Sequence, residues 1–291
     1  MPSTPVRCLM AAGLLVLTLT LAAQAAEQRL LIAPRLTDER LSEAEPPHLV
    51  VYEAGKPDAP LLVWLSGTGG KPATGPQHFY ETVLRQGYRL LALSYLDTPA
   101  VSQVCVGATL RAQRDCAGRM RQQRAWGDPN GLVDDRPEDA IVPRLTRLLQ
   151  HLARSDGAGH WEQYLDGDEP RWARLVLAGQ SQGGGMAAYI AQTRRVAGVI
   201  MFSGGWDRRA GGDIAQWYSR PAVTPPQLWH GTFHVLEPQA AAMDQIYRRL
   251  GLPADHIHGL SEPVKGRHPH GEGIGNAAYQ TLWEQMLQLQ R

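Results

Sequence analysis

The stretch that decides the fold runs from Arg174 to Gln192 and reads RLVLAGQSQGGGMAAYIAQ. A short apolar run ends at a glycine, Ser181 stands between two glutamines, and three glycines lead into a helix-like segment. This order predicts a strand, a tight turn and a helix. Glycines on both sides clear the space around one hydroxyl. That arrangement indicates a reactive serine, and the alternative is a tight turn that carries no chemistry.

The same alternation of short apolar runs and longer amphipathic segments extends over the chain, and it is typical of an α/β fold with a mostly parallel sheet covered on both faces. We expect strands at residues 30–33, 48–52, 60–65, 88–94, 174–178, 197–202, 227–229 and 256–258, the first two antiparallel. We expect helices at residues 77–85, 138–154, 184–193, 239–250 and 276–289. Two insertions, near residues 96–136 and 206–226, interrupt this order. Long loops at the carboxyl ends of parallel strands build binding surfaces.

The first residues resemble a signal peptide. Arg7 precedes an apolar stretch at residues 10–23, and Ala23-Gln24-Ala25 offers small residues for cleavage. We expect residues 1–25 to be removed and residues 26–291 to form a single domain in a periplasmic or secreted protein without a membrane anchor. An uncleaved anchor is the alternative. The net charge of +1 argues against nucleic acid or an anionic membrane as the main partner.

Two cysteines remain after that cleavage, Cys105 and Cys116. In an oxidising compartment such a pair is expected to form a disulfide, worth on the order of 3 kcal/mol in the chain-entropy model. Free thiols or a metal pair are the alternatives, and the spacing does not match a metal motif. The basic run at residues 111–124 lies in the same insertion, and it reads as a solvated helix face or as a surface that attracts an acidic substrate.

Ser181 lies in a G-x-S-x-G motif between a predicted strand and a predicted helix, which is the setting of a nucleophile elbow. A serine hydroxyl needs a base. His268 and His270 lie before the last predicted helix, where such a base belongs in the chain order serine, acid, histidine. We favour His270, because a following glycine suits a ring that must reach over the serine. Solvated loop residues are the alternative for both histidines.

The acid is less clearly marked. After the predicted strand at residues 227–229 the next carboxylate is Glu237, and Asp207 in FSGGWD lies one strand earlier. Both are candidates, and we favour Glu237. For an oxyanion hole we expect the backbone N–H of Gln182 and that of Thr68, in the glycine-rich segment SGTGG. The glycine spacing there fits neither a P-loop nor a dinucleotide fingerprint, so we expect no cofactor.

Other aromatic and histidine residues have weaker claims. Trp206 and Trp217 are candidates for the wall of an apolar pocket, whereas Trp229 is expected in the core. Histidines gather at residues 256–270, but no carboxylate stands at a convincing ligand spacing, so we expect no metal site.

Taken in order, SGTGG, the paired cysteines, GQSQGGGMAAYIA, FSGGWD and the late His-Gly resemble the α/β-hydrolase superfamily over roughly residues 61–289. They are similar in particular to a group of secreted serine hydrolases whose elbow reads G-H-S-Q-G-G-G. The resemblance implies the fold and a site of serine, acid and histidine. Gln180 stands where that group has histidine. Phe233 and Glu237 match an element that otherwise ends in aspartate, which favours Glu237 as the acid.

The expected function is that of an exported serine hydrolase that cleaves carboxylic esters of small acyl substrates through an acyl-enzyme. Two alternatives remain open from the sequence. One is a binding protein that keeps the fold without turnover, suggested by the missing aspartate. The other is an amide or peptide hydrolase that uses the same residues.

Overall fold

A computed structural model describes residue 1, residues 27–42 and residues 45–288 of the chain. The predicted signal peptide therefore lies outside the described residues apart from Met1. Within the described ranges no helix combines the length and the apolar character that crossing a bilayer requires.

The centre of the molecule is an eight-stranded sheet. Its strands lie in the order β1-β2-β4-β3-β7-β8-β9-β10. β2 is antiparallel to both β1 and β4, and the other neighbours are parallel. The strand bounds are Glu27–Ile32 (β1), His48–Glu53 (β2), Leu61–Leu65 (β3), Arg89–Leu93 (β4), Leu175–Gln180 (β7), Gly198–Phe202 (β8), Trp229–His234 (β9) and Ile257–Leu260 (β10). This topology confirms the predicted α/β-hydrolase fold, including its antiparallel entry.

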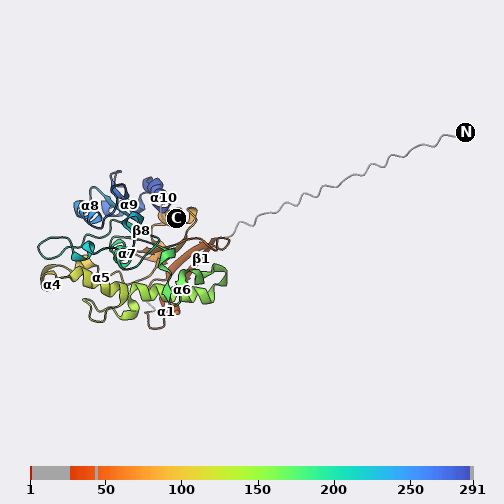
Figure 1. Cartoon of the computed structure of the whole chain (residues 1–291), viewed down its shortest axis with the longest axis horizontal. Coiled ribbons are helices and arrows are strands. Elements are labelled where there is room, and N and C mark those ends of the chain that lie inside the picture. The colour runs from red at the N-terminus through yellow and green to blue at the C-terminus, as the bar shows by residue number, and fades with distance from the viewer. Residues whose placement is uncertain (2–26, 43–44, 289–291) are drawn as a thin grey trace.

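Helices cover both faces of the sheet, because alternate side chains of each inner strand enter different cores. Leu61, Val63 and Leu65 of β3 join the core under one set of helices, whereas Leu62 and Trp64 join the other core. The first core packs α5 (Cys116–Trp126), α6 (Ile141–Ser155), α7 (Gln182–Thr193) and α8 (Ala240–Arg249). The second core packs α2 (Gln77–Arg85) and α10 (Gln280–Gln288). Figure 1 shows α5 and α6 along one side of the molecule and α10 on the opposite side.

Short elements complete the chain. They are α1 (Pro34–Thr37), α3 (Val101–Val104), α4 (Gly107–Ala112), α9 (Glu272–Gly275) and the small hairpin of β5 (Leu165–Asp166) and β6 (Glu169–Pro170). The insertion after β4 holds α3, α4 and α5, and a disulfide joins Cys105 to Cys116 within it, as the sequence predicted. This crosslink ties the end of α3 to the first residue of α5.

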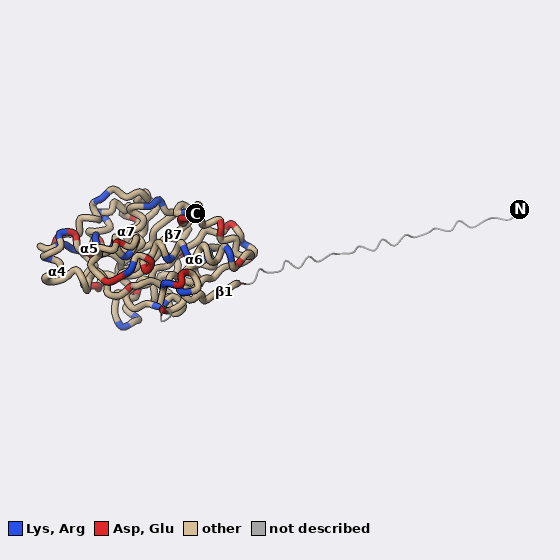
Figure 2. The backbone as a smooth tube through the Cα atoms, turned by 90° about the horizontal axis from the view of Figure 1, so that it is seen from below, with Lys and Arg blue, Asp and Glu red and all other residues tan. Residues whose placement is uncertain are grey.

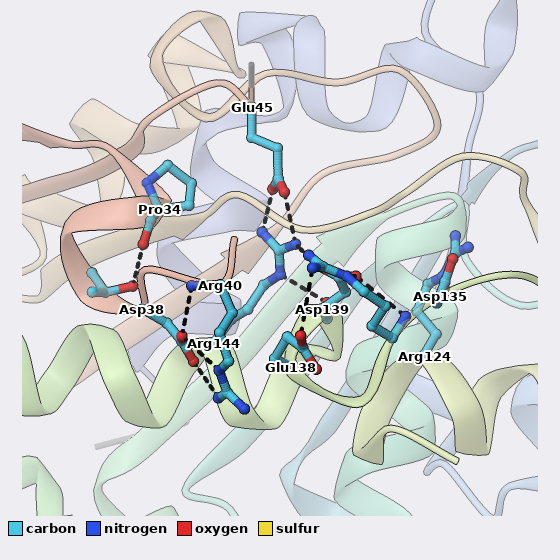
Figure 3. Close-up of polar contacts among 11 residues, drawn as sticks. Pro34, Asp38, Arg40, Glu45, Arg124, Asp135, Glu138, Asp139 and Arg144 are labelled. Carbon is cyan, nitrogen blue, oxygen red and sulfur yellow. Dashed lines mark hydrogen bonds and ion pairs between the residues drawn. The ribbon is translucent and has the colours of Figure 1, made fainter. Parts of the chain in front are cut away.

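A buried arginine joins the segment before β2 to the covering helices. The Arg144 side chain, on α6, is fully buried and pairs with the carboxylates of Glu45 and Asp139 (Figure 3). Its Nε also donates to the Asp139 carbonyl at 2.8 Å. Because two acceptor side chains and a carbonyl surround the guanidinium, the charge is compensated where water cannot reach it.

Positive and negative side chains are interspersed along the chain (Figure 2). The basic run at residues 111–124 is not one solvated helix face. Arg111, Arg114 and Arg119 are exposed, but Arg121 and Arg124 are buried and pair with Asp207 and Asp135. A helix that packs in the core can carry arginines inward when each finds a carboxylate. The run is therefore part surface and part core.

The buried His48 is expected to make the free energy of unfolding depend on pH. Burial, followed by the charge of Arg144, lowers its pKa to about 3, and its Nδ1 accepts the Ser94 N–H at 2.9 Å. An unfolded histidine titrates near pH 6.5, so between about pH 7 and pH 5 the unfolded chain gains a proton that the folded chain does not. We expect the free energy of unfolding to fall by about 2 kcal/mol over that interval because of His48 alone.

The His48→Asn variant tests this expectation by urea unfolding at several pH values. An asparagine oxygen can accept the same N–H without titrating, so the loss of stability between pH 7 and pH 5 should shrink by about 2 kcal/mol. An unchanged pH slope would contradict the assignment. The window lies above the range in which most carboxylates titrate.

Candidate active site

Ser181 lies between β7 and α7 in a strained backbone conformation. Its φ and ψ are 55° and −118°, in a region that L-residues rarely adopt. Its N–H donates to the Phe202 carbonyl at 2.9 Å, and its own carbonyl accepts the N–H of Gly185 as α7 begins. The turn is thus held from the neighbouring strand and from the helix. This conformation projects the hydroxyl from the end of β7, as a nucleophile elbow does.

Two glycines make this turn possible. A Cβ placed on Gly183 would lie 2.0 Å from the Leu65 carbonyl oxygen, and one on Gly179 would lie 2.5 Å from the backbone of Gly183. Both obstacles are backbone atoms, which cannot move aside as a flexible side chain can. The glycines therefore allow α7 to pack directly on the ends of β3 and β7.

The glycine-rich segment at residues 66–70 passes beside the serine. A Cβ on Gly67 would lie 3.2 Å from the Ser181 Cβ. The N–H groups of Gly69 and Gly70 are occupied, because they donate to Asp97 Oδ1 at 3.0 Å and to the Gly67 carbonyl at 2.9 Å. Thr68, the residue predicted for the oxyanion hole, is exposed at this turn. Gln182, the other predicted donor, is the first residue of α7, where a helix leaves its N–H without an intrahelical acceptor.

Glu237 and His270 are brought together although 32 residues separate them in the chain. Glu237 Oε2 lies 2.6 Å from His270 Nδ1. The glutamate side chain is fully buried, whereas the histidine side chain keeps 35% of its surface exposed. Because an ionised carboxylate only accepts hydrogen bonds, this contact places the imidazole proton on Nδ1 and leaves the Nε2 lone pair free in the neutral ring.

The second carboxylate oxygen of Glu237 is held by two donors. Ser203 Oγ and the His234 N–H donate to Glu237 Oε1 at 2.6 and 2.7 Å. Ser203 itself has a φ of 46°, a second strained residue at the carboxyl end of a parallel strand. Sequence reasoning missed Ser203, although it belongs to the FSGGWD motif that was noted for its aspartate. It also ended β9 too early: the structure extends this strand to His234, so Glu237 follows it after two residues.

Glu272 shapes the loop that carries His270. Its carboxylate accepts the N–H groups of Lys265 and Gly266 at 3.0 and 2.6 Å and the side-chain amide of Asn276 at 3.0 Å. Burial alone would raise the pKa of Glu272, but these donors together lower it. His268, the alternative base, is exposed on the same loop. Within the described residues, no hydrogen bond to its ring is seen.

Asp207, the alternative acid, has other partners. Arg121 Nε and Nη2 donate to its two oxygens at 2.5 and 2.8 Å, and Trp217 Nε1 donates at 2.9 Å. Burial alone would lower the pKa of Arg121, but the Asp207 carboxylate holds it above its ordinary value. Asp207 is therefore committed to a buried ion pair. Trp217 is fully buried beside it rather than lining a pocket, which corrects the sequence interpretation of that residue.

A narrow cavity of about 20 Å³ lies against Ser181. Ala100, Val101 and Trp206 contribute its apolar wall, and Gln182 and Arg121 also line it. Arg121 Nη1 and Gln182 Nε2 are buried without a hydrogen-bond partner within the described structure. Arg121 and Gln182 can therefore each donate a hydrogen bond to an acceptor oxygen placed in this cavity.

Trp206 links this cavity to the histidine, because its ring meets the His270 ring edge-on with centroids 5.2 Å apart. The side chain of Gln180, next to Ser181, donates to the His270 carbonyl at 3.3 Å. These contacts bring the histidine loop and the elbow to the same edge of the sheet.

Among the described residues, no three His, Cys, Asp or Glu side chains are arranged to hold a metal ion. His230, His256 and His258 lie close to one another at the edge of the sheet, where ring centroids of His230 and His256 are 4.0 Å apart. Burial lowers the pKa of His230 to about 3 and that of His258 to about 4.

Comparison with known proteins gives structural neighbours but no relative in sequence. No family model matches the chain, and no curated protein matches it. One similar structure is the esterase LipW from Mycobacterium marinum, at 16% identity and a TM-score of 0.49, covering 92% of this chain and 82% of that one. Another is a dienelactone hydrolase from Anabaena variabilis, at 16% identity and a TM-score of 0.48, covering 89% and 96%. A hormone-sensitive lipase from a metagenome library has 15% identity and a TM-score of 0.45, covering 84% and 81%.

The Arg121–Asp207 pair leads to a stability prediction. The Asp207→Asn substitution leaves the buried guanidinium without a counter-charge, so we expect the free energy of unfolding to fall by about 3 kcal/mol. Asp213→Asn is the matched control, because Asp213 pairs with Arg209 at 2.9 Å on the exposed part of the same insertion. Loss of the exposed Asp213–Arg209 pair should lower the free energy of unfolding by less than about 1 kcal/mol. Equal shifts of the urea midpoint in the two variants would contradict the prediction.

Proposed function

We propose that the chain is a serine hydrolase that cleaves carboxylic esters through an acyl-enzyme. The observation that carries the proposal is the combination of a strained, half-exposed Ser181 with a Glu237–His270 pair at the same edge of the sheet. A serine alone is a poor nucleophile, and a strained turn alone is only a turn. A histidine whose Nδ1 is held by a carboxylate supplies the base that the hydroxyl needs.

In the first half of the reaction, His270 Nε2 takes the proton of Ser181 as Oγ attacks the ester carbonyl carbon. Glu237 stabilises the imidazolium that forms, because its Oε2 lies 2.6 Å from Nδ1. The C–O bond to the alcohol then breaks, and the imidazolium returns its proton to the leaving oxygen. Ser181 is left as an acyl ester.

In the second half, water replaces the alcohol. His270 deprotonates the water as it attacks the acyl carbon, and the imidazolium then protonates Ser181 Oγ as the acid product leaves. The negatively charged oxygen of each tetrahedral intermediate would accept hydrogen bonds from the backbone N–H groups of Gln182 and Thr68. The first belongs to the helix N-terminus beneath the serine, which adds the favourable end of the helix dipole.

The hypothesis of an inactive binding protein rests on the absence of an aspartate at the usual position after β9. Glu237 supplies a carboxylate that contacts His270, so the hypothesis of an inactive protein loses its main support. Hydrolysis of amides would use the same residues. We favour esters, because an alkoxide is a better leaving group than the nitrogen anion of an amide, so that its departure depends less on the proton that His270 delivers. We further propose that the protein is exported, which the leader-like residues 1–25 and the disulfide support.

Replacement of the serine tests the nucleophile. Ser181→Ala should abolish hydrolysis of 4-nitrophenyl acetate, and a fluorophosphonate probe should add its mass to the wild type but not to this variant. Ser155→Ala, at the exposed end of α6, is the control and should be labelled like the wild type. A folded wild-type protein that the probe does not label would contradict the proposal.

Replacement of the glutamate tests the acid. Glu237→Gln puts a possible donor opposite His270 Nδ1 and favours the wrong tautomer, so kcat should fall by about 10³- to 10⁴-fold. Glu284→Gln on α10, where the half-buried Glu284 accepts a hydrogen bond from the Gln280 side chain at 2.8 Å, is the control and should keep the wild-type kcat. A kcat of Glu237→Gln close to that of the wild type, with the fold verified by circular dichroism, would exclude Glu237 as the acid.

A further inference from the structure

A groove lined by arginines involves the insertion after β8, the segment that also supplies Trp206 to the cavity at Ser181. Its volume is about 1050 Å³, and its lining includes Arg111, Arg114, Arg208, Arg209 and Arg249. All five arginines are exposed to solvent. Asp213 is the one carboxylate among the described lining residues, so five positive charges face one negative charge.

These arginines come from three parts of the chain. Arg111 is on α4 and Arg114 follows that helix, Arg208 and Arg209 belong to the insertion after β8, and Arg249 ends α8. A solvated helix face would place its charges on one element. Here three separate elements place arginines around one groove. Like charges that lie close together repel one another, so this arrangement is unfavourable unless an anion binds there.

Internal partners satisfy only part of this charge. Arg209 pairs with Asp213 at 2.9 Å, and Arg208 donates to the Gly212 carbonyl. Within the described part of the chain, no hydrogen bond or ion pair is seen for the guanidinium groups of Arg111, Arg114 and Arg249. Three planar donors therefore remain available, and each can hold a carboxylate or phosphate in two parallel hydrogen bonds.

One segment of the chain lines both the groove and the cavity at Ser181. Trp206 lines the small cavity at Ser181 and contacts His270, and Arg208, two residues later, lines the groove. Two residues span at most about 7 Å of backbone. An extended molecule in the groove could therefore reach the site.

We infer that this groove binds an oligomeric anion, a chain that carries several carboxylate or phosphate groups. A single small anion would occupy a small part of about 1050 Å³ and could not reach guanidiniums on all three elements. A chain with repeated negative charges meets Arg111, Arg114 and Arg249 at once. Its binding requires no hydrolysis, so it can be tested without a functional Ser181.

Calorimetric titration of the Ser181→Ala protein with trigalacturonate and with tripolyphosphate tests the inference and distinguishes carboxylate from phosphate chains. We expect at least one probe to bind, more weakly at about 300 mM than at about 50 mM NaCl because salt screens exposed charges. Adding Arg111→Gln, Arg114→Gln and Arg249→Gln together should raise Kd about tenfold or more.

The control carries Arg154→Gln, Arg171→Gln and Arg195→Gln in the same Ser181→Ala background. These arginines are exposed and lie outside the groove, and the substitutions remove the same net charge. The control should keep the Kd of the parent. Absence of binding by both probes, or equal loss in the two triple variants, would overturn the inference. If the wild-type protein showed no esterase activity, that result would contradict the proposed function and leave the test of the groove unaffected.

Discussion

The backbone of Ser181 is the constraint on which the rest of the site depends. A non-glycine residue with positive φ costs about 1–3 kcal/mol and persists where its surroundings determine it. Here the Phe202 carbonyl holds the Ser181 N–H, and Gly183 packs its backbone against Leu65. The same contacts bring the ends of β3, β7 and β8 to one point. The segment at residues 66–70 and the start of α7 therefore lie beside Ser181, and the strained Ser203 follows the end of the neighbouring strand.

Asp207 follows β8 and Glu237 follows β9, and the different partners of these two buried carboxylates give them different roles. Asp207 accepts hydrogen bonds from Arg121 and Trp217, so a cation already compensates its charge. Glu237 accepts from neutral donors at one oxygen and turns the other toward His270. Arg121, which comes from the insertion after β4, thus makes Asp207 a structural residue and leaves Glu237 as the carboxylate that faces the histidine.

Local signals in the sequence were enough for the fold and for the tight turn between β7 and α7. The apolar runs, the glycines around Ser181 and the cysteine pair each act over a few residues, and the sheet and the disulfide that they predicted are confirmed. The choice between Glu237 and Asp207 could not be derived in this way, because it depends on where Arg121 lies after folding. For the same reason Trp217 was placed in a pocket although it is buried.

The segment after β8 joins the features that the sequence left separate. At three successive positions, Trp206 contacts His270, Asp207 pairs with Arg121, and Arg208 lines the arginine groove. The segment is held in shape, since the Ala215 N–H donates to the Asp207 carbonyl at 3.0 Å and Arg208 pairs with Ile214 in a β-bridge. The buried ion pair is its anchor. Because Trp206, Asp207 and Arg208 are adjacent in the chain, the Arg121–Asp207 pair fixes the backbone that presents Trp206 to the His270 ring and Arg208 to the groove.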